Sequence, residues 1–231
     1  MFAIPLLAAV IAAVFAGVVL QQFGRRGHMH QLYWGSALAM FALAAAFETF
    51  GAAHGWTATS YRGYYLFGGV LNVGWLGVGS VQLISPRRVG PVAAIVMLIL
   101  SVAAIPAVIV SHVDASLLSA AVPGRGAIAA PAIIFAPVTN ILGTVALVGG
   151  AAWSAWRAWR RGAPPGLVLG LVILAAGAFV VAGTHSYAQT AGVYAIQPVG
   201  EAIGIVGMFV GYLVIEAQRQ PAARASRPEA S

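Results

Sequence analysis

The chain has 231 residues, of which 61% are hydrophobic and only 7% charged, and it contains neither cysteine nor lysine. A soluble domain carries about 25% charged residues, so this composition excludes an ordinary soluble domain. The absence of cysteine excludes disulfides, thiol redox chemistry and cysteine-based zinc or iron–sulfur sites. The formal charge of +7 comes from arginines in short clusters beside apolar runs. This pattern favours membrane topology over nucleic-acid binding.

Seven apolar runs follow one another along the chain, each close to the ~20 residues that cross a hydrocarbon core. They predict an all-α integral membrane protein, a seven-transmembrane-helix bundle that forms one domain over residues 1–217. A short basic tail at 218–231 is expected to be disordered. The predicted spans are 2–23, 31–52, 63–85, 90–111, 129–153, 166–187 and 194–217.

The arginines are distributed unequally between the two sides of the predicted bundle. Only Arg62 and Arg125 lie in connections on the side of the N-terminus, so the positive-inside rule predicts an external N-terminus and a cytoplasmic C-terminus. We therefore expect a multi-pass protein of the cell (plasma) membrane, such as a bacterial inner membrane. The other side carries ten: Arg25, Arg26, Arg87, Arg88, Arg157, Arg160, Arg161, Arg219, Arg224 and Arg227.

The stretch "AAFETFGAAHGWTATSYRGYYLF" contains Glu48 and Arg62 at the facing ends of two predicted spans. A carboxylate within a span costs several kcal/mol unless it is paired, protonated or hydrated. Further polar residues lie at a similar depth in other spans, whereas the inner half shows little beyond Gln82 and small hydroxyl residues. One hypothesis is an outward-facing site for ligand binding or proton handling, formed by Glu48, Arg62, Tyr65, Asn72, Asn140, His185 and Glu201.

Two structural interpretations stand beside this hypothesis. Glu48 could pair with Arg62 and fix the second span against the third without any ligand. If the seventh span begins at Pro198, Glu201 lies in its first turn, where the helix dipole favours an anion. The sequence leaves these alternatives open.

Small residues and prolines predict features of helix packing. Gly200, Gly204, Gly207 and Gly211 are spaced four, three and four residues apart, which places them on one helix face that another helix can approach closely. Pro131 and Pro137 predict a kink near Asn140 in the fifth span.

Metal and haem sites receive weaker support. A transmembrane haem needs two histidines that face each other across helices, and only His185 lies within a span, so haem is disfavoured. His54, His112, Asp114 and His185 are weak candidates for an outer metal site. Such a site would permit a metal-dependent membrane hydrolase.

The seven spans, the external N-terminus and the length resemble the layout of the microbial rhodopsins. The segments "YRGYYLF" in the third span and "EAIGIVG" in the seventh are similar to the corresponding helices of that family. Rhodopsins bind retinal through a lysine in the seventh span. Because this chain has no lysine, covalent retinal is excluded and the resemblance is one of layout.

The preferred function is a non-enzymatic binding or sensory membrane protein with an outward-facing polar pocket. Arg62 would anchor an anionic or polar group of a small-molecule ligand. A sensor would need a membrane-protein partner, docked on the inner surface formed by Trp153, Trp156, Trp159 and their neighbouring arginines. The alternatives are a small-solute or proton-coupled transporter and an accessory subunit of a larger membrane complex.

Overall fold

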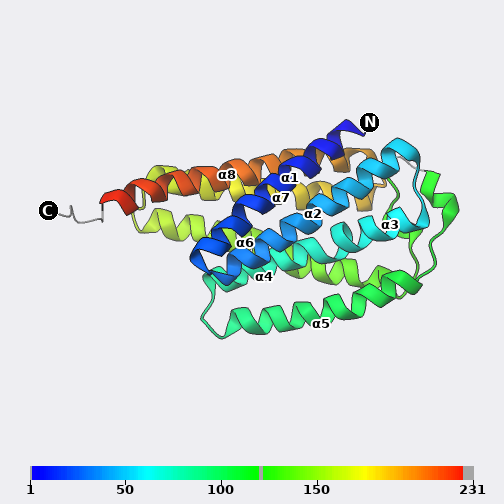
Figure 1. The fold of residues 1–231 in the computed structure, drawn as a ribbon, viewed down its shortest axis with the longest axis horizontal. Coiled ribbons are helices and arrows are strands. Elements are labelled where there is room, and N and C mark those ends of the chain that lie inside the picture. The colour runs from blue at the N-terminus through cyan, green and yellow to red at the C-terminus, as the bar shows by residue number, and fades with distance from the viewer. Residues whose placement is uncertain (1, 120–121, 226–231) are drawn as a thin grey trace.

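The computed structural model describes residues 2–119 and 122–225, except for the side chains of Gln189 and of residues 219–225. The described residues are 87% helical, and seven helices among them are long and apolar enough to cross a membrane. This confirms the predicted seven-helix membrane bundle. The spans run along the long axis of the molecule, and the first helix begins towards the end opposite to the one where the last helix ends (Figure 1).

Most of the observed helices begin and end within a few residues of the predicted spans. The third span begins earlier than predicted, at Ala58, the fifth helix both begins and ends later, at Phe135 and Arg160, and the seventh span is longer. The third span is the least regular, because a π-helical segment interrupts it. The last helix continues past residue 217 to Ala225, and residues 226–231 lie outside the described residues. The elements are α1 (Ala3–Arg26), α2 (Met29–His54), α3 (Ala58–Tyr64), η1 (Tyr65–Leu71), α4 (Asn72–Ile84), α5 (Val89–Val110), η2 (Ala115–Ser119), η3 (Arg125–Ala127), η4 (Ala132–Ile134), α6 (Phe135–Arg160), α7 (Pro165–Ala191), η5 (Tyr194–Ile196) and α8 (Gln197–Ala225).

Local sequence signals set several helix ends. Gly27 adopts a left-handed conformation (φ 67°) and ends α1, as glycine commonly does after a helix. Thr57 and Ser60 form a reciprocal capping box at the start of α3, in which each side chain accepts a backbone N–H of the other. Pro165 is the first residue of α7, where its missing N–H costs no hydrogen bond.

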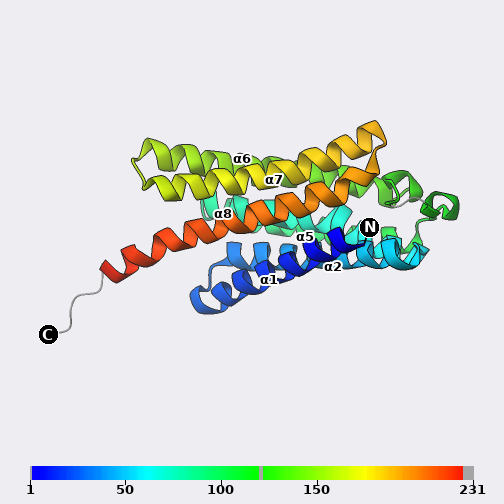
Figure 2. The ribbon, with the colours of Figure 1, turned by 90° about the horizontal axis from the view of Figure 1, so that it is seen from above.

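Six spans form a ring, and α5 lies outside it. Successive neighbours around the ring are α1, α2, α4, α6, α7 and α8, and α8 returns to α1, while α5 packs mainly on α4. Figure 2 shows α6 and α7 on one side of the bundle, α1 and α2 on the other, and α8 between them. Exposed apolar side chains such as Ile99, Val102 and Ile109, each 62% exposed, cover α5. In a membrane these side chains face lipid.

The packing between α7 and α8 is close. A Cβ atom on Gly204 would lie 2.7 Å from the carbonyl oxygen of Gly177, and one on Gly211 would lie 2.7 Å from that of Gly170. No side chain fits at these distances, so the two backbones touch because both helices carry glycine there. The faces of α8 that carry Gly200 and Gly207 likewise rest on α7.

We call the end of the bundle where α1 begins, α2 ends and α3 begins the Arg62 end. There the third span holds the connection between α5 and α6 in place through two hydrogen bonds. The Tyr61 hydroxyl donates to the Gly124 carbonyl (2.8 Å), and the Tyr65 hydroxyl donates to the Ala132 carbonyl (3.4 Å). Tyr61 and Tyr65 are one helical turn apart, which explains why both reach the same connection.

The kink predicted near Asn140 is not observed. Pro131 precedes the short turn η4, and Pro137 is the third residue of α6, which then continues unbroken to Arg160. Near the start of a helix, proline lacks only an N–H that would have no helical partner, so it leaves the helix intact. The irregular third span contains no proline; its π-helical segment is instead stabilised from outside, as shown below.

Candidate functional site

The ring of helices encloses a cavity of about 290 Å³ at the Arg62 end. Residues of α2, of the span α3–η1–α4, and of α6, α7 and α8 line it, and the α5–α6 connection contributes Pro123 and Arg125. Neither α1 nor α5 contributes a lining residue. The cavity therefore lies inside the ring, where residues distant in the sequence meet.

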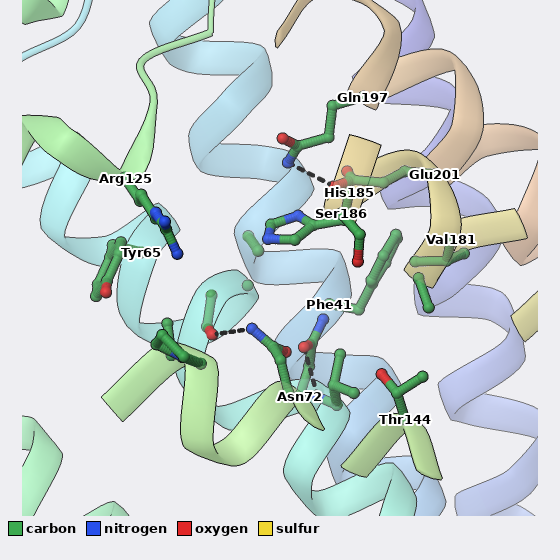
Figure 3. Close-up of a pocket in the computed structure, with 18 of the residues that line it drawn as sticks. Phe41, Tyr65, Asn72, Arg125, Thr144, Val181, His185, Ser186, Gln197 and Glu201 are labelled. Carbon is green, nitrogen blue, oxygen red and sulfur yellow. Dashed lines mark hydrogen bonds between the residues drawn. The ribbon is translucent and has the colours of Figure 1, made fainter. Parts of the chain in front are cut away.

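The mouth of the cavity is polar. Arg125 extends from the α5–α6 connection towards His185 of α7, and Gln197 and Glu201 of α8 line the same cavity (Figure 3). The Gln197 Nε2 atom donates to Glu201 Oε1 (2.9 Å) and also to the hydroxyl of Tyr64. A guanidinium, an imidazole, an amide and a carboxyl group thus surround one opening.

Deeper in the cavity, the walls become mostly apolar. Asn72 and Thr144 lie on the far side from the mouth, opposite Gln197 (Figure 3). A molecule in this space would therefore meet hydrogen-bonding groups at the mouth and hydrocarbon along most of its length. The larger apolar side chains of the lining are Phe41, Val73, Ile141, Leu147, Val148, Val181, Ile205 and Met208.

The π-helical segment η1 forms one wall of the cavity. A π-helix widens the turn and displaces backbone groups from their usual partners, and such segments are frequent at functional sites. Here Asn140 of α6 donates from Nδ2 to the carbonyl oxygen of Gly69 (2.8 Å). Asn140 therefore stabilises the irregular backbone of η1 while its own side chain lines the cavity.

Five of the seven predicted site residues line this cavity, namely Tyr65, Asn72, Asn140, His185 and Glu201. Glu48 and Arg62 do not. The Arg62 Nη2 atom donates to the carbonyl of Ser111 (3.0 Å), the residue that caps the C-terminus of α5. A cation is favourable at that position because the last carbonyls of a helix carry partial negative charge. Arg62 thus fixes α5 and is not placed to anchor a ligand in the cavity.

The alternative pairing of Glu48 with Arg62 is also not formed. Glu48 is only 1% exposed, and its carboxyl group interacts with that of Glu201. The ion pair found among the described residues is instead that of Arg26 with Glu216 at the other end of the bundle (3.2 Å). The first-turn interpretation of Glu201 also fails, because α8 begins at Gln197 and Glu201 lies one residue beyond its first turn.

The candidate metal ligands do not assemble. Within residues 2–119 and 122–225, no three histidine or acidic side chains gather as a metal site would require. His54 stacks on Phe50 (4.9 Å between ring centroids), whereas His185 faces the cavity. Asp114 is fully exposed, and hydrogen bonds from the hydroxyl and amide of Ser116 lower the pKa of its carboxyl group.

The opposite end of the bundle is more polar than expected. A smaller cavity of about 70 Å³ lies there, between α1, α2, α4, α6, α7 and α8. The expectation of an almost apolar inner half was therefore wrong, because polar residues scattered over several helices converge in the fold. The polar members of its lining are Gln22, His30, Gln31, Ser80, Ser154 and Glu216.

Two residues at the cavity mouth were not among the predicted site residues. Arg125 stood out in the sequence as one of two arginines on its side, but it lies in an irregular connection that carries no periodic signal. Gln197 precedes Glu201 by four residues, a spacing that places both side chains on one helix face. This spacing and the polar character of both residues could have identified Gln197 as a site residue from the sequence.

No protein-family model, curated protein or solved structure matches this chain. The chemistry of the cavity is therefore the basis on which a function is assigned.

Proposed function

We propose that this chain is a non-enzymatic binding or sensory protein of the cell membrane, whose ligand is a small amphipathic molecule with an anionic or hydrogen-bonding head group. The cavity at the Arg62 end carries this proposal, because its polar mouth leads into an apolar interior. Ligand pockets in proteins commonly have volumes of about 300–1,000 Å³ and combine apolar walls with a few placed polar groups. The volume of about 290 Å³ suits a ligand at the small end of this range.

The head group would lie between Arg125 and His185. Arg125 is close enough to interact electrostatically with His185 and Tyr65, and its planar guanidinium suits a carboxylate or phosphate. The apolar tail would extend towards Phe41 and Met208. With the N-terminus outside the cell, as the arginine distribution predicts, the mouth would open outwards.

The first test is native mass spectrometry of the protein purified in mild detergent from its own host. We expect a reproducible added mass on the wild type, and its loss in Arg125→Ala. Arg62→Lys is the matched control, because Arg62 lies at the same end but outside the cavity, and this variant should keep the mass. A bare wild-type protein, or equal retention by Arg125→Ala, would contradict the proposal.

A second candidate function is transport of a small solute. Leu147 of α6, 6% exposed, lines both the large cavity and the smaller cavity at the opposite end. One side chain thus stands between two cavities that lie towards opposite ends of the bundle. Alternating access requires such a barrier near the middle of the membrane.

Substitutions at Leu147 separate the two candidates. If the protein is a transporter, Leu147→Ala should increase the flux into proteoliposomes of the mass-identified ligand, and Leu147→Trp should abolish it. If the protein is a binding protein, neither variant should support flux above that of empty liposomes. Val145→Trp is the control on the same helix, because Val145 is 68% exposed and lines neither cavity.

A further inference from the structure

Glu48 is an acidic side chain enclosed by the bundle without a hydrogen-bond donor. It lies on α2 at 1% exposure, and both carboxyl oxygens lack a hydrogen-bond donor among the described residues. Burial of an ionised carboxyl group without donors or a counter-charge is strongly unfavourable. Glu48 therefore needs either a cation or a proton.

The neighbour that the fold supplies is a second carboxyl group. Glu201 of α8 interacts directly with Glu48, and its one donor from the described protein is the amide of Gln197 (2.9 Å). The titratable group that faces both acids from α3 is the hydroxyl of Tyr64, which is neutral at ordinary pH and accepts from Gln197. None of these neighbours supplies positive charge. Arg125 and His185 line the same cavity as Glu201, but neither is among the groups that interact with its carboxyl group.

The charged groups on the surrounding helices are directed elsewhere. Arg62 of α3 donates to the Ser111 carbonyl, and Arg26 of α1 pairs with Glu216 of α8 at the opposite end. His54, on the same helix as Glu48, stacks on Phe50. Two carboxyl groups in contact and without a cation cannot both be ionised, because each negative charge disfavours the other in a medium of low dielectric constant.

Each member of the pair lines a different cavity. Glu201 lines the ligand cavity described above. Glu48 lines a separate cavity of about 300 Å³ at the same end of the bundle, together with Pro5, Ala52, Trp56 and Pro198. The two carboxyl groups therefore stand where these cavities approach each other.

We propose that Glu48 and Glu201 form one shared proton-binding site that connects the two cavities. A hydronium ion in the cavity lined by Glu48 and Ala52 donates a proton to a Glu48 oxygen, and the proton held by Glu201 passes to a water molecule in the ligand cavity. The proton on Glu48 then moves to Glu201, which restores the starting state. The pair thus keeps one proton and one negative charge throughout, and one proton passes from one cavity to the other. This inference does not depend on a ligand in the large cavity.

Infrared spectroscopy tests the shared proton directly. At pH 7 we expect the C=O stretch of one protonated carboxyl group in the wild type, and its loss in the double variant Glu48→Gln/Glu201→Gln. Superimposable wild-type and double-variant spectra in this region would overturn the proposal. Melting curves check that the amide variants, which keep the shape of the side chains, remain folded.

A second measurement leaves the pair unchanged. The chain has four glutamates, Glu48, Glu201, Glu216 and Glu229, so Glu216→Gln/Glu229→Gln retains only the pair. With ¹³C-glutamate incorporated into this variant, the acid band must shift to lower frequency if it arises from Glu48 and Glu201. An unshifted band would overturn the assignment even if the double variant of the pair failed to fold.

The route of exchange is tested with a matched pair of alanines. Ala52 lines the second cavity, whereas the adjacent Ala53 does not, and both are exposed. Ala52→Leu should slow the H/D exchange of the acid band at least tenfold, and Ala53→Leu should leave it unchanged. Equal exchange rates in both variants would show that the proton does not reach Glu48 through this cavity.

Discussion

Gly143 of α6 lies directly against the backbone of Val73 in α4, so that a Cβ atom on Gly143 would overlap the Val73 carbonyl group. A Cβ atom on Gly77 of α4 would in turn lie 2.6 Å from the Cα of Gly143. This contact holds together two helices that form adjacent walls of the cavity. The width of the cavity therefore depends on the absence of side chains at these two positions.

The first prediction concerns this contact. Gly143→Ala should separate α4 from α6 and lower the free energy of unfolding by about 1–3 kcal/mol, the usual cost of overpacking. Gly149→Ala on the same helix is the control. A Cβ there meets no atom within 4 Å, so this variant should be neutral or slightly stabilising. Thermal unfolding in detergent measures both, and equal melting temperatures would contradict the proposed role of the contact.

The second prediction concerns Asn140, the residue that supports the π-helical segment. Asn140→Ala removes the donor to the Gly69 carbonyl. Loss of one partner of a buried hydrogen bond costs about 1–3 kcal/mol, so the melting temperature should fall. Thr144→Val, one turn further along α6, keeps its side-chain volume and should change stability by less than about 0.5 kcal/mol. Similar melting temperatures for Asn140→Ala and the wild type would show that η1 does not need this support.

The third prediction separates the two arginines at the Arg62 end. Arg62→Ala should lower the free energy of unfolding by about 1–2 kcal/mol, since the Ser111 carbonyl loses its donor. It should leave ligand retention unchanged at temperatures where the protein stays folded. Arg62→Lys should restore part of the stability, because a charged donor remains at the end of α5.

Arg125→Ala should weaken ligand binding and leave the stability of the protein almost unchanged. Loss of a hydrogen bond to a charged group costs about 1.5–3 kcal/mol, which corresponds to a roughly 10- to 100-fold weaker affinity for the ligand identified by mass spectrometry. Its melting temperature without ligand should remain close to that of the wild type, because Arg125 is exposed in a connection. If Arg62→Ala weakened binding more than Arg125→Ala, the assignment of the two roles would be reversed.

The fourth prediction concerns orientation. Because the chain contains no cysteine, a single introduced cysteine reports its own location without background. A membrane-impermeant maleimide should label Ala53→Cys in intact cells, and should label Arg88→Cys only after the cells are permeabilised. Both positions are exposed, Ala53 in the last turn of α2 and Arg88 just before α5, at opposite ends of the bundle. The reverse labelling pattern would place the cavity mouth in the cytoplasm.

The sequence by itself determined which seven segments form membrane helices and, for most of them, roughly where they begin and end. Apolar runs of about 20 residues form transmembrane helices because a backbone in lipid must satisfy its own hydrogen bonds. This requirement is local, so α1 and α5 could be predicted to within a few residues. The glycines of α8 likewise followed from spacing alone, since residues three and four apart share one helix face.

The tertiary structure decided which polar groups meet. Glu48 and Arg62 are neighbours in the sequence, and their opposite charges suggested a pair, yet Arg62 reaches α5 and Glu48 meets Glu201 of α8. Arg125 enters the site from a connection whose path depends on hydrogen bonds to Tyr61 and Tyr65. Side-chain contacts of this kind depend on the rotation of each helix about its axis. Packing against neighbouring helices sets that rotation, and the hydropathy of a single span does not record it.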